Sequence, residues 1–304
     1  RLIDTLSIGR RVPNSPWVAY RQFCAHFLAP LAVAAYRDIR TLGLWRNHID
    51  GYPLDLAVGM LSAWRRHMPR LFLHLTLHAR FQKRSDRKED LGKDLAVRTP
   101  TVSDSGLVAI VRSLRHLITG IQWRRSSRIW ETYEHIRTYD TNDVTAKSGY
   151  VDAVVRRLKP KVVWDLGANV GEFSKIAAVG GAFVVSIEGD PACVEQLYQR
   201  VFHAKEMNHV LPLTMDLANP TPGLGWDGCE RLGLKDRGPA DLLLSLALIH
   251  HLVFSGCIPL VEIAKWLSSL TKYALVEFVP PADPMVRKLM KNRGKNHLPY
   301  DLNT

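Results

Sequence analysis

The residues with the clearest chemical potential lie in one short stretch, where Asp165, Gly167, Asn169 and Gly171 are separated by single apolar residues. The apolar residues 162–164 in front of them predict a buried parallel strand. The two glycines suit a tight turn because they lack a Cβ and tolerate unusual dihedral angles. A strand, a glycine turn and a helix in this order bring backbone N–H groups close to a nucleotide-like ligand.

The spacing of this stretch separates the nucleotide-binding classes. A dinucleotide fingerprint needs glycine at position 169 and glycine or alanine at position 172, where this chain has Asn169 and Glu172. A P-loop needs a G-K-[ST] sequence, which the chain lacks. The remaining pattern, Asp-Leu-Gly-x-Asn-x-Gly, resembles motif I of the class I S-adenosylmethionine (SAM) methyltransferases. Since SAM carries a positive sulfonium and no phosphate, it tolerates acidic residues near the turn. The alternative is a strand–turn–helix that binds no ligand.

Two further carboxylates follow at suitable distances. Glu188 lies 23 residues after Asp165, close to the offset of about 20 residues at which such folds place a ribose-binding carboxylate. The resemblance implies that Asp216, after the next strand, holds the adenine amino group. A side chain at Gly171 is expected to fill the space where the turn meets the ligand. The residues predicted to bind SAM are Asp165, Gly167, Asn169, Gly171, Glu188 and Asp216.

Apolar runs after the motif predict the remaining strands of a sheet. They cover residues 182–187, 210–215, 241–249 and 273–279. Helix signals separate several of them, including a run from Glu172 that stops at Gly180 and a helix opened by Pro191. The pattern and the resemblance together predict an α/β fold with a Rossmann-like, mainly parallel sheet, preceded by a mostly helical N-terminal region.

Histidines are the candidate catalytic residues. His250 and His251 follow the fourth predicted strand, where the related methyltransferases place acceptor-facing side chains. A histidine titrates near neutral pH and could take a proton from the acceptor, so we expect activity to rise between about pH 5.5 and 7.5. Consecutive side chains point in different directions, and His251 is the preferred base. The alternative for both is a structural role at a helix start, and hydrogen bonding is the expected role of Glu277.

A metal site has weaker support. His74 and His78 are four residues apart and would share one helix face, as paired metal ligands do. No H-E-x-x-H glutamate accompanies them, because residue 75 is leucine. The prediction is therefore that the protein uses no metal.

Other stretches extend the resemblance over most of the chain. They are similar to a bacterial group of SAM-dependent methyltransferases that includes rhizobial nodulation-related proteins. The stretches are residues 20–24, 27–31, 50–54, 246–252 and 277–280, together with Trp130, Tyr133 and Lys147. The resemblance implies SAM as cofactor and leaves the methyl acceptor undefined.

Composition limits the partners and the compartment. Residues 1–150 carry 24 Lys and Arg against 13 Asp and Glu, whereas residues 151–304 carry 17 against 16. The basic half is either a solvated surface or a contact for something anionic, such as an anionic small-molecule or carrier-bound acceptor; nucleic acid is a further candidate without a recognisable motif. Four cysteines without a C-x-x-C pair, together with the absence of a signal peptide or membrane span, predict a cytoplasmic protein.

The predicted domain division places a helical, acceptor-capping region in residues 1–120 and the SAM-binding core in residues 121–304. Class I methyltransferases usually add a sixth and a seventh strand after a helix like the one predicted over residues 284–293. A two-strand hairpin needs about 12 residues, and only ten follow Gly294. We therefore expect a core without its last two strands, a fragment, and an exposed fifth strand.

These observations predict an enzyme that transfers a methyl group from SAM to an oxygen or nitrogen acceptor. A catalytically silent SAM-fold scaffold is one alternative. An NAD-dependent oxidoreductase is the other, and Asn169 and Glu172 weaken it.

Overall fold

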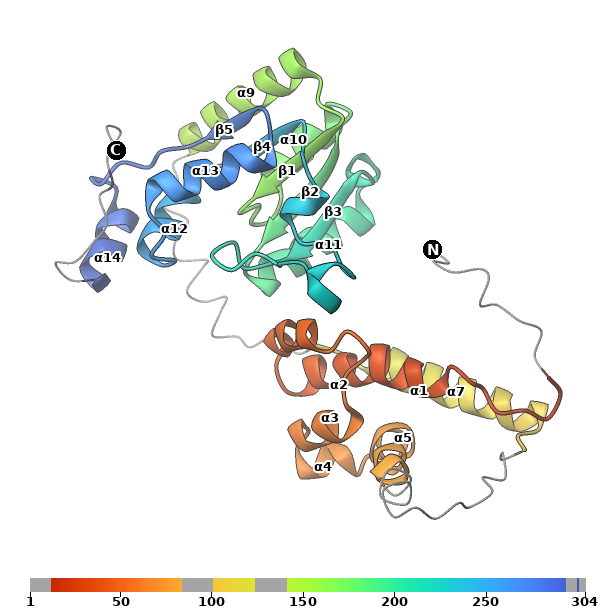
Figure 1. Ribbon diagram of the computed structural model, residues 1–304. Helices are drawn as coiled ribbons and strands as arrows, with labels where there is room; N and C mark the ends of the chain where they lie inside the picture. Colours follow the sequence, from red (N-terminus) through yellow and green to blue (C-terminus); the bar gives the residue numbers. More distant parts are fainter. Residues whose placement is uncertain (1–11, 84–100, 124–140, 294–299, 301–304) are drawn as a thin grey trace. The chain divides into compact units, whose positions relative to one another are not determined.

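The computed structural model describes residues 12–83, 101–123, 141–293 and 300. The chain separates into two compact units, which we call the N-terminal unit (residues 1–124) and the C-terminal unit (residues 125–304). Both are shown in Figure 1. The predicted aromatic pair Trp130 and Tyr133 lies outside the described residues.

The N-terminal unit consists of helices and the turns that connect them, with no strand among its described residues. Its first helix runs without a break through α1, a π-helical stretch η1 and α2 and ends at Tyr36, where a 3₁₀ segment follows. Residues 71–78 are helical as well. The elements are α1 (Tyr20–Phe23), η1 (Cys24–Leu28), α2 (Ala29–Tyr36), η2 (Ile39–Asn47), α3 (Leu54–Met60), α4 (Ala63–Arg66), α5 (Pro69–Leu71), η3 (Phe72–Leu77) and α7 (Asp104–Gly120).

One apolar core holds this unit together. Leu28, Leu71, Leu75 and Leu114 are buried within it, and burial of one such side chain stabilises the fold by about 1.5–3 kcal/mol. His74 is also buried there, with Nδ1 bonded to the Tyr20 hydroxyl at 2.7 Å and Nε2 to the Ser113 hydroxyl at 2.8 Å. Both ring nitrogens of His74 therefore have protein partners, which is the arrangement of a core histidine.

The C-terminal unit contains a five-stranded, wholly parallel sheet with the strand order β3-β2-β1-β4-β5. Its order reverses between β1 and β4, because successive strands are added first on one side of β1 and then on the other. The strands are β1 (Val162–Leu166), β2 (Phe183–Glu188), β3 (Val210–Thr214), β4 (Leu242–Ser245) and β5 (Ala274–Val276).

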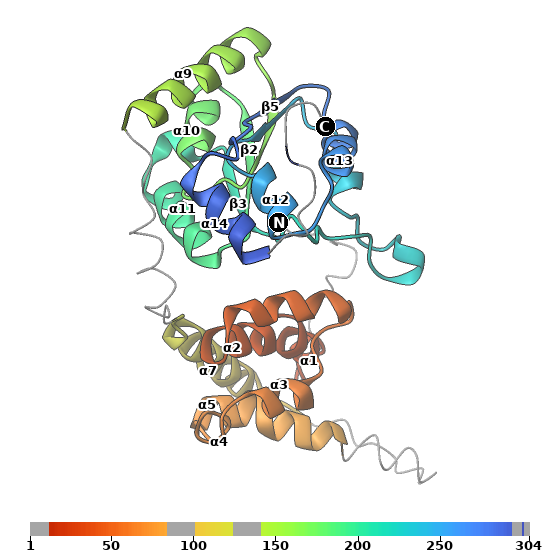
Figure 2. The same ribbon diagram turned by 90° about the vertical axis from the view of Figure 1, so that its left-hand side faces the viewer.

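Helices cover both faces of the sheet, and each face has its own core. Figure 2 shows α9, α10 and α11 on one side and α13 on the other. Side chains alternate accordingly: Val163 and Val184 belong to the first core, and Trp164 and Ile187 to the second. The elements are α9 (Thr141–Leu158), α10 (Glu172–Val179), α11 (Pro191–His203), α12 (Ile249–Phe254), α13 (Leu260–Leu270), α14 (Pro284–Arg293) and the short 3₁₀ segments η4 (Lys205–Met207), η5 (Trp226–Gly228) and η6 (Lys235–Arg237).

The predicted α/β Rossmann-like fold is confirmed, with corrections to some boundaries. The apolar run 241–249 is not one strand: β4 ends at Ser245, and Ile249 begins α12. Nine consecutive mostly apolar residues fit a buried strand or a buried helix equally well, so apolarity alone does not mark the break. Pro212 lies inside β3, which it can do because β3 is an edge strand of the described sheet.

The residues after β5 form α14, as predicted, and Asp283 caps its start: the carboxylate accepts the Val286 N–H at 3.2 Å. The absence of a sixth and seventh strand stays a prediction, because residues 294–299 and 301–304 lie outside the described part of the chain. None of the described helices has the length and apolar composition that crossing a bilayer requires.

Candidate functional site

The candidate site begins at the loop between β1 and α10. Gly167, Asn169 and Gly171 all have positive φ, at 77°, 49° and 82°. Two of them are glycines, which adopt this conformation without steric penalty, and asparagine tolerates it better than most residues. The Gly167 and Ala168 N–H groups both donate to the Ile187 carbonyl, at 2.9 and 3.1 Å, so the loop is fastened to β2.

Glu188, at the end of β2, is the residue that holds this loop at its tip. Its Oε2 accepts the Asn169 N–H and its Oε1 accepts the Asp190 N–H, each at 2.9 Å. The glutamate is half-buried, so part of its side chain remains accessible from solvent. The structure thus brings together the predicted carboxylate and the predicted loop through a contact that the sequence does not show.

Asp216 follows β3 and completes the row of acidic residues. It is exposed, and its Oδ1 accepts the Ala218 N–H at 2.9 Å. The preceding residue, Met215, donates its N–H to the Glu188 carbonyl at 2.9 Å. Asp165, Glu188 and Asp216 therefore lie at the carboxyl ends of three adjacent strands, the edge at which open α/β sheets bind ligands.

Asp165 differs from the other two because it is buried, at 2% exposure. Its Oδ2 accepts the Ser174 hydroxyl at 2.5 Å, and the Ser186 hydroxyl donates to Ser174 at 2.7 Å. Burial raises the pKa of Asp165 to about 6; the Ser174 hydrogen bond opposes this rise and the charge of Glu188 adds to it. The carboxyl is therefore buried between β1 and α10 and does not face solvent.

Gly171 and Arg200 fix the start of α10. A Cβ at Gly171 would lie 2.3 Å from Leu197 Cδ1 on α11, so the missing side chain allows α10 and α11 to pack. That Gly171 also leaves room for the ligand stays a prediction. Arg200, also on α11, donates to the Val170 carbonyl at 3.1 Å and to Glu172 Oε1 at 2.6 Å. The guanidinium thereby compensates the carboxylate at the N-terminus of α10.

The loop after β4 meets the loop after β1. A Cβ placed on Gly167 would lie 3.3 Å from Leu248 Cδ1. In this second loop Ala247 has φ of 52°, an unfavourable conformation for a residue with a Cβ. Strained residues of this kind concentrate at functional sites, and here Asn169 and Ala247 lie in the two loops on either side of the reversal in strand order.

The two candidate histidines lie in the first turn of α12, with ring centroids 4.3 Å apart. His250 is buried at 2% exposure and its Nδ1 has no hydrogen-bond partner in the described residues. His251 is exposed. Burial lowers the pKa of His250 to about 4; the charges of His251 and Lys147 lower it further and that of Asp283 opposes them. His250 is thus the buried histidine of the pair, and the charges of Lys147 and Asp283 act on it.

Glu277, just beyond β5, forms an ion pair with Lys147 on α9. Lys147 Nζ and Glu277 Oε1 are 2.8 Å apart, and the side chains are only 20% and 22% exposed. Glu277 Oε2 is buried and unpartnered. Glu277 Oε1 thus has the kind of polar partner predicted for this residue, whereas Oε2 has none among the described residues.

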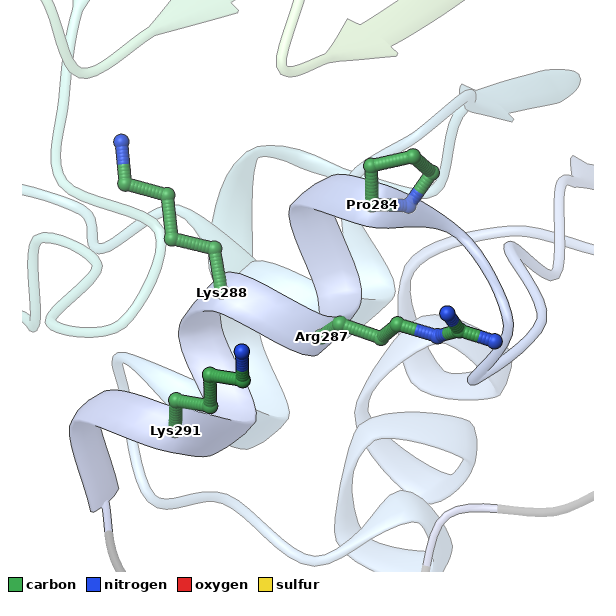
Figure 3. A pocket seen from close by; sticks show the side chains of 4 residues that line it. All are labelled: Pro284, Arg287, Lys288 and Lys291. Carbon is green, nitrogen blue, oxygen red and sulfur yellow. The ribbon is translucent and has the colours of Figure 1, made fainter.

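A surface cavity of about 370 Å³ lies on α14 (Figure 3). It is lined by Pro284, Arg287, Lys288 and Lys291, so its side chains carry three positive charges and no negative one. None of the residues predicted to bind SAM lines it.

Some contributors could not be identified from the sequence. Arg200 is far along the chain from Glu172, and no short-range pattern connects them. Ser186 could have been identified from the sequence, because it is a polar residue in an otherwise apolar strand. In the structure it pairs with Asp165 in the register of β1 and β2. Among the described residues, no group of three or more His, Cys, Asp or Glu side chains could hold a metal ion.

Comparison with known proteins supplies a relative and several similar folds. No family model matches the chain. The chain is 32% identical over 295 residues to the nodulation protein NoeA of Rhizobium meliloti (strain 1021); the match covers 96% of this chain and 61% of NoeA, so the chain spans less than two thirds of this relative. The expected resemblance to a group with rhizobial nodulation-related members is thereby confirmed.

Solved structures with similar folds have low sequence identity. Monomeric WbdD is 18% identical with a TM-score of 0.38, covering 57% of this chain and 38% of its own. Cofactor-bound Rv0187 from MTB is 15% identical with a TM-score of 0.36, covering 53% and 71%. The CcbJ methyltransferase from Streptomyces caelestis is 15% identical with a TM-score of 0.33, covering 44% and 54%.

The fold class follows from the sheet itself, since its order, its parallel strands and its helices on both faces are observed directly. The chain is therefore a relative of a rhizobial nodulation protein, built on the Rossmann-like α/β fold found in class I methyltransferases.

Proposed function

We propose that the protein binds SAM at the carboxyl ends of β1, β2 and β3 and transfers its methyl group to an oxygen or nitrogen acceptor in the cytoplasm. The observation that carries this proposal is the row of Asp165, Glu188 and Asp216 at the ends of adjacent strands, joined to a loop with three residues at positive φ. A cationic ligand suits this acidic edge, whereas the pyrophosphate of a dinucleotide would be repelled by it.

The residues of the chain would contribute mainly by positioning. When bound, SAM would supply a methyl group attached to a positive sulfur. The sulfur keeps the electron pair of the carbon–sulfur bond that breaks. Glu188 and Asp216 would orient the ribose and adenine through hydrogen bonds to their free lone pairs. The acceptor atom forms the new bond to carbon, and its proton passes to a base, for which His250 and His251 are the candidates.

Calorimetric titration with SAM tests the binding site. Glu188→Ala should weaken SAM binding by about 1–3 kcal/mol, because charge-assisted hydrogen bonds and the support of the Asn169 loop are both lost. Glu195→Ala on α11 is the matched control, since this half-buried glutamate accepts the side-chain amide of Gln199, one turn along the same helix, at 2.8 Å. Equal SAM affinity in the Glu188 and Glu195 variants would contradict the proposed site.

Methyl-labelled SAM incubated with a cell extract tests the transfer itself. Label that appears in an acceptor with the wild-type protein, and not with Glu188→Ala, supports an enzyme. SAM binding without any labelled product would favour a catalytically silent scaffold. Binding of NADH in place of SAM would favour an oxidoreductase.

A further inference from the structure

The exposed face of α14 carries a concentration of positive charge. Four of the ten residues of this helix are Arg or Lys, and none is Asp or Glu. Its cavity is lined by Pro284, Arg287, Lys288 and Lys291 (Figure 3), which follow the i, i+3, i+4, i+7 spacing of one helix face. We call Arg287, Lys288 and Lys291, which are all exposed, the basic stripe.

The opposite face of α14 holds the basic stripe in place. Val286 is fully buried in an apolar core, and Leu289 and Met290 pack against that core. The same core contains residues of α12, and the two helices lie side by side (Figures 1 and 2). Because His250 and His251 lie on α12, the basic stripe belongs to a helix that packs directly against the one with the candidate bases.

No ion pair joins the basic stripe to a carboxylate among the described residues. By contrast, Lys265 on α13 pairs with Glu262 on the same helix, with Nζ and Oε1 2.7 Å apart. Asp283, just before α14, accepts the Val286 N–H at 3.2 Å, which directs its carboxylate to the start of the helix. Like charges three and four residues apart destabilise a helix. A bound anion would remove this repulsion, so the arrangement favours a ligand as the counterion.

The side chains of the basic stripe restrict the class of anion. The guanidinium of Arg287 presents forked N–H groups that can bond two oxygens of one oxyanion, and each lysine adds a compact positive charge. The cavity lining has three positive charges and no negative one. A doubly charged group therefore gains more from it than a singly charged carboxylate does. A phosphate monoester has both this charge and the required oxygens.

We propose that the basic stripe binds a phosphate group carried by the methyl acceptor and thereby anchors the acceptor beside α12. Total charge conceals this site, because residues 151–304 carry 17 Lys and Arg against 16 Asp and Glu. The acidic edge at β1, β2 and β3 suits the cationic donor, and the basic stripe suits an anionic acceptor. The inference deepens the proposed function and rests on it for the transfer, but the binding of phosphate needs no SAM.

Calorimetric titration without SAM tests the binding of phosphate to the full chain. Phenyl phosphate and phenyl sulfate have nearly the same shape, but at about pH 8 the first carries two negative charges and the second one. At constant ionic strength, phenyl phosphate should saturate a single site, and phenyl sulfate should bind at least about tenfold more weakly. Equal affinity for the two esters, or no saturable binding of phenyl phosphate, would overturn the proposal.

Charge-removing variants test whether the basic stripe is the site. The combined variant is Arg287→Gln, Lys288→Gln and Lys291→Gln. It should bind phenyl phosphate at least about tenfold more weakly than wild type, because charge-assisted hydrogen bonds are lost. The matched control removes three exposed cations from other elements, as Arg157→Gln, Lys235→Gln and Lys265→Gln combined. An equal loss in the control would show that net charge alone attracts the ester and would refute the site.

Methyl-labelled SAM tests the connection to the acceptor. The combined variant of the basic stripe should bind SAM as wild type does but form at least about tenfold less labelled product in a cell extract. Treating the extract with phosphatase beforehand should abolish labelling by the wild type. Labelling that phosphatase does not affect would refute a phosphorylated acceptor. A wild-type protein that binds phenyl phosphate and labels nothing would instead refute the proposed transfer, with the phosphate site upheld.

Discussion

Asp165 connects the stability of the sheet to pH. Its carboxyl is buried, and its pKa is raised to about 6, from about 3.9 in an unfolded chain. A raised acid pKa means that the folded state binds the proton more tightly. The stabilisation is therefore fully present below about pH 4 and is lost as the pH rises through about 6.

This shift predicts a specific difference between wild type and Asp165→Asn. Two pKa units correspond to about 3 kcal/mol, so between about pH 4 and 7 the wild type should lose about that much stability relative to the variant, whose amide does not titrate. Urea unfolding of the C-terminal unit across this pH range measures the difference. Parallel stability curves for the two proteins would show that Asp165 does not titrate in this window.

The pH dependence of kcat for methyl transfer distinguishes His250 from His251 as the base. An ordinary histidine gives a rise in kcat near pH 6.5, but burial lowers the pKa of His250 to about 4. If His250 takes the acceptor proton, kcat should be flat from about pH 5.5 to 7.5 and reduced throughout in His250→Asn. Desolvation also lowers the pKa of His251 from the ordinary histidine value. A rise in kcat at a pH below that ordinary value, which disappears in His251→Asn, would therefore assign the base to His251.

Some features of the site could be predicted from single residues. The spacing of Asp165, Gly167 and Gly171 predicts the loop, because the preference for glycine depends on the local backbone dihedral angles. The contact partners are not local: Glu188 meets the Asn169 N–H, and the absent Cβ of Gly171 is directed at Leu197. Such contacts depend on how α11 packs, which no residue spacing encodes.

At the scale of elements, Arg200 predicts a coupling between α11 and the loop after β1. Arg200→Ala removes a bond to the Val170 carbonyl and the pair with Glu172. The side chains are 39% and 55% exposed, so we expect a stability loss of only about 0.5–1 kcal/mol, together with several-fold weaker SAM binding. Arg156→Ala, which breaks the exposed pair with Asp152 within α9, is the control and should leave SAM affinity unchanged.

The boundaries of helices could be predicted where proline, glycine or a capping residue marks them. Pro191 with the Asp190 cap starts α11, and Gly180 ends α10 where the sequence places the stop. The break between β4 and α12 carries no such residue, because Leu246, Ala247 and Leu248 continue the apolar run. The chain turns there at Ala247, which has a left-handed backbone conformation. An alanine in the sequence does not predict that conformation.

The outer edge of β5 predicts self-association. In the described sheet β5 pairs with β4 alone, and Val276 is 42% exposed. An uncovered strand edge offers unpaired N–H and C=O groups to a second copy of the chain. We expect concentration-dependent dimers in sedimentation equilibrium, reduced by Val276→Lys. A monomer at all concentrations in both proteins would show that this edge is protected.

For the whole molecule, the uneven charge predicts salt-sensitive binding by the basic half. Residues 1–150 have an excess of 11 positive charges, against one for residues 151–304. Binding to heparin or RNA should then weaken steeply with salt, as counterion release requires. Titrations at low and high salt, with an anionic phosphorylated metabolite alongside, measure this. No salt-dependent binding to any of the three would mean that these charges only solvate the surface.

The reversal of strand order has a consequence for how this chain can diversify. The proposed donor contacts come from the loops after β1, β2 and β3, while the candidate bases His250 and His251 come from the chain after β4. The two sets of residues are thus inherited as consecutive, separable stretches of one gene. Exchanging the segment from β4 onward between relatives should yield chimeras that keep the donor and change the acceptor.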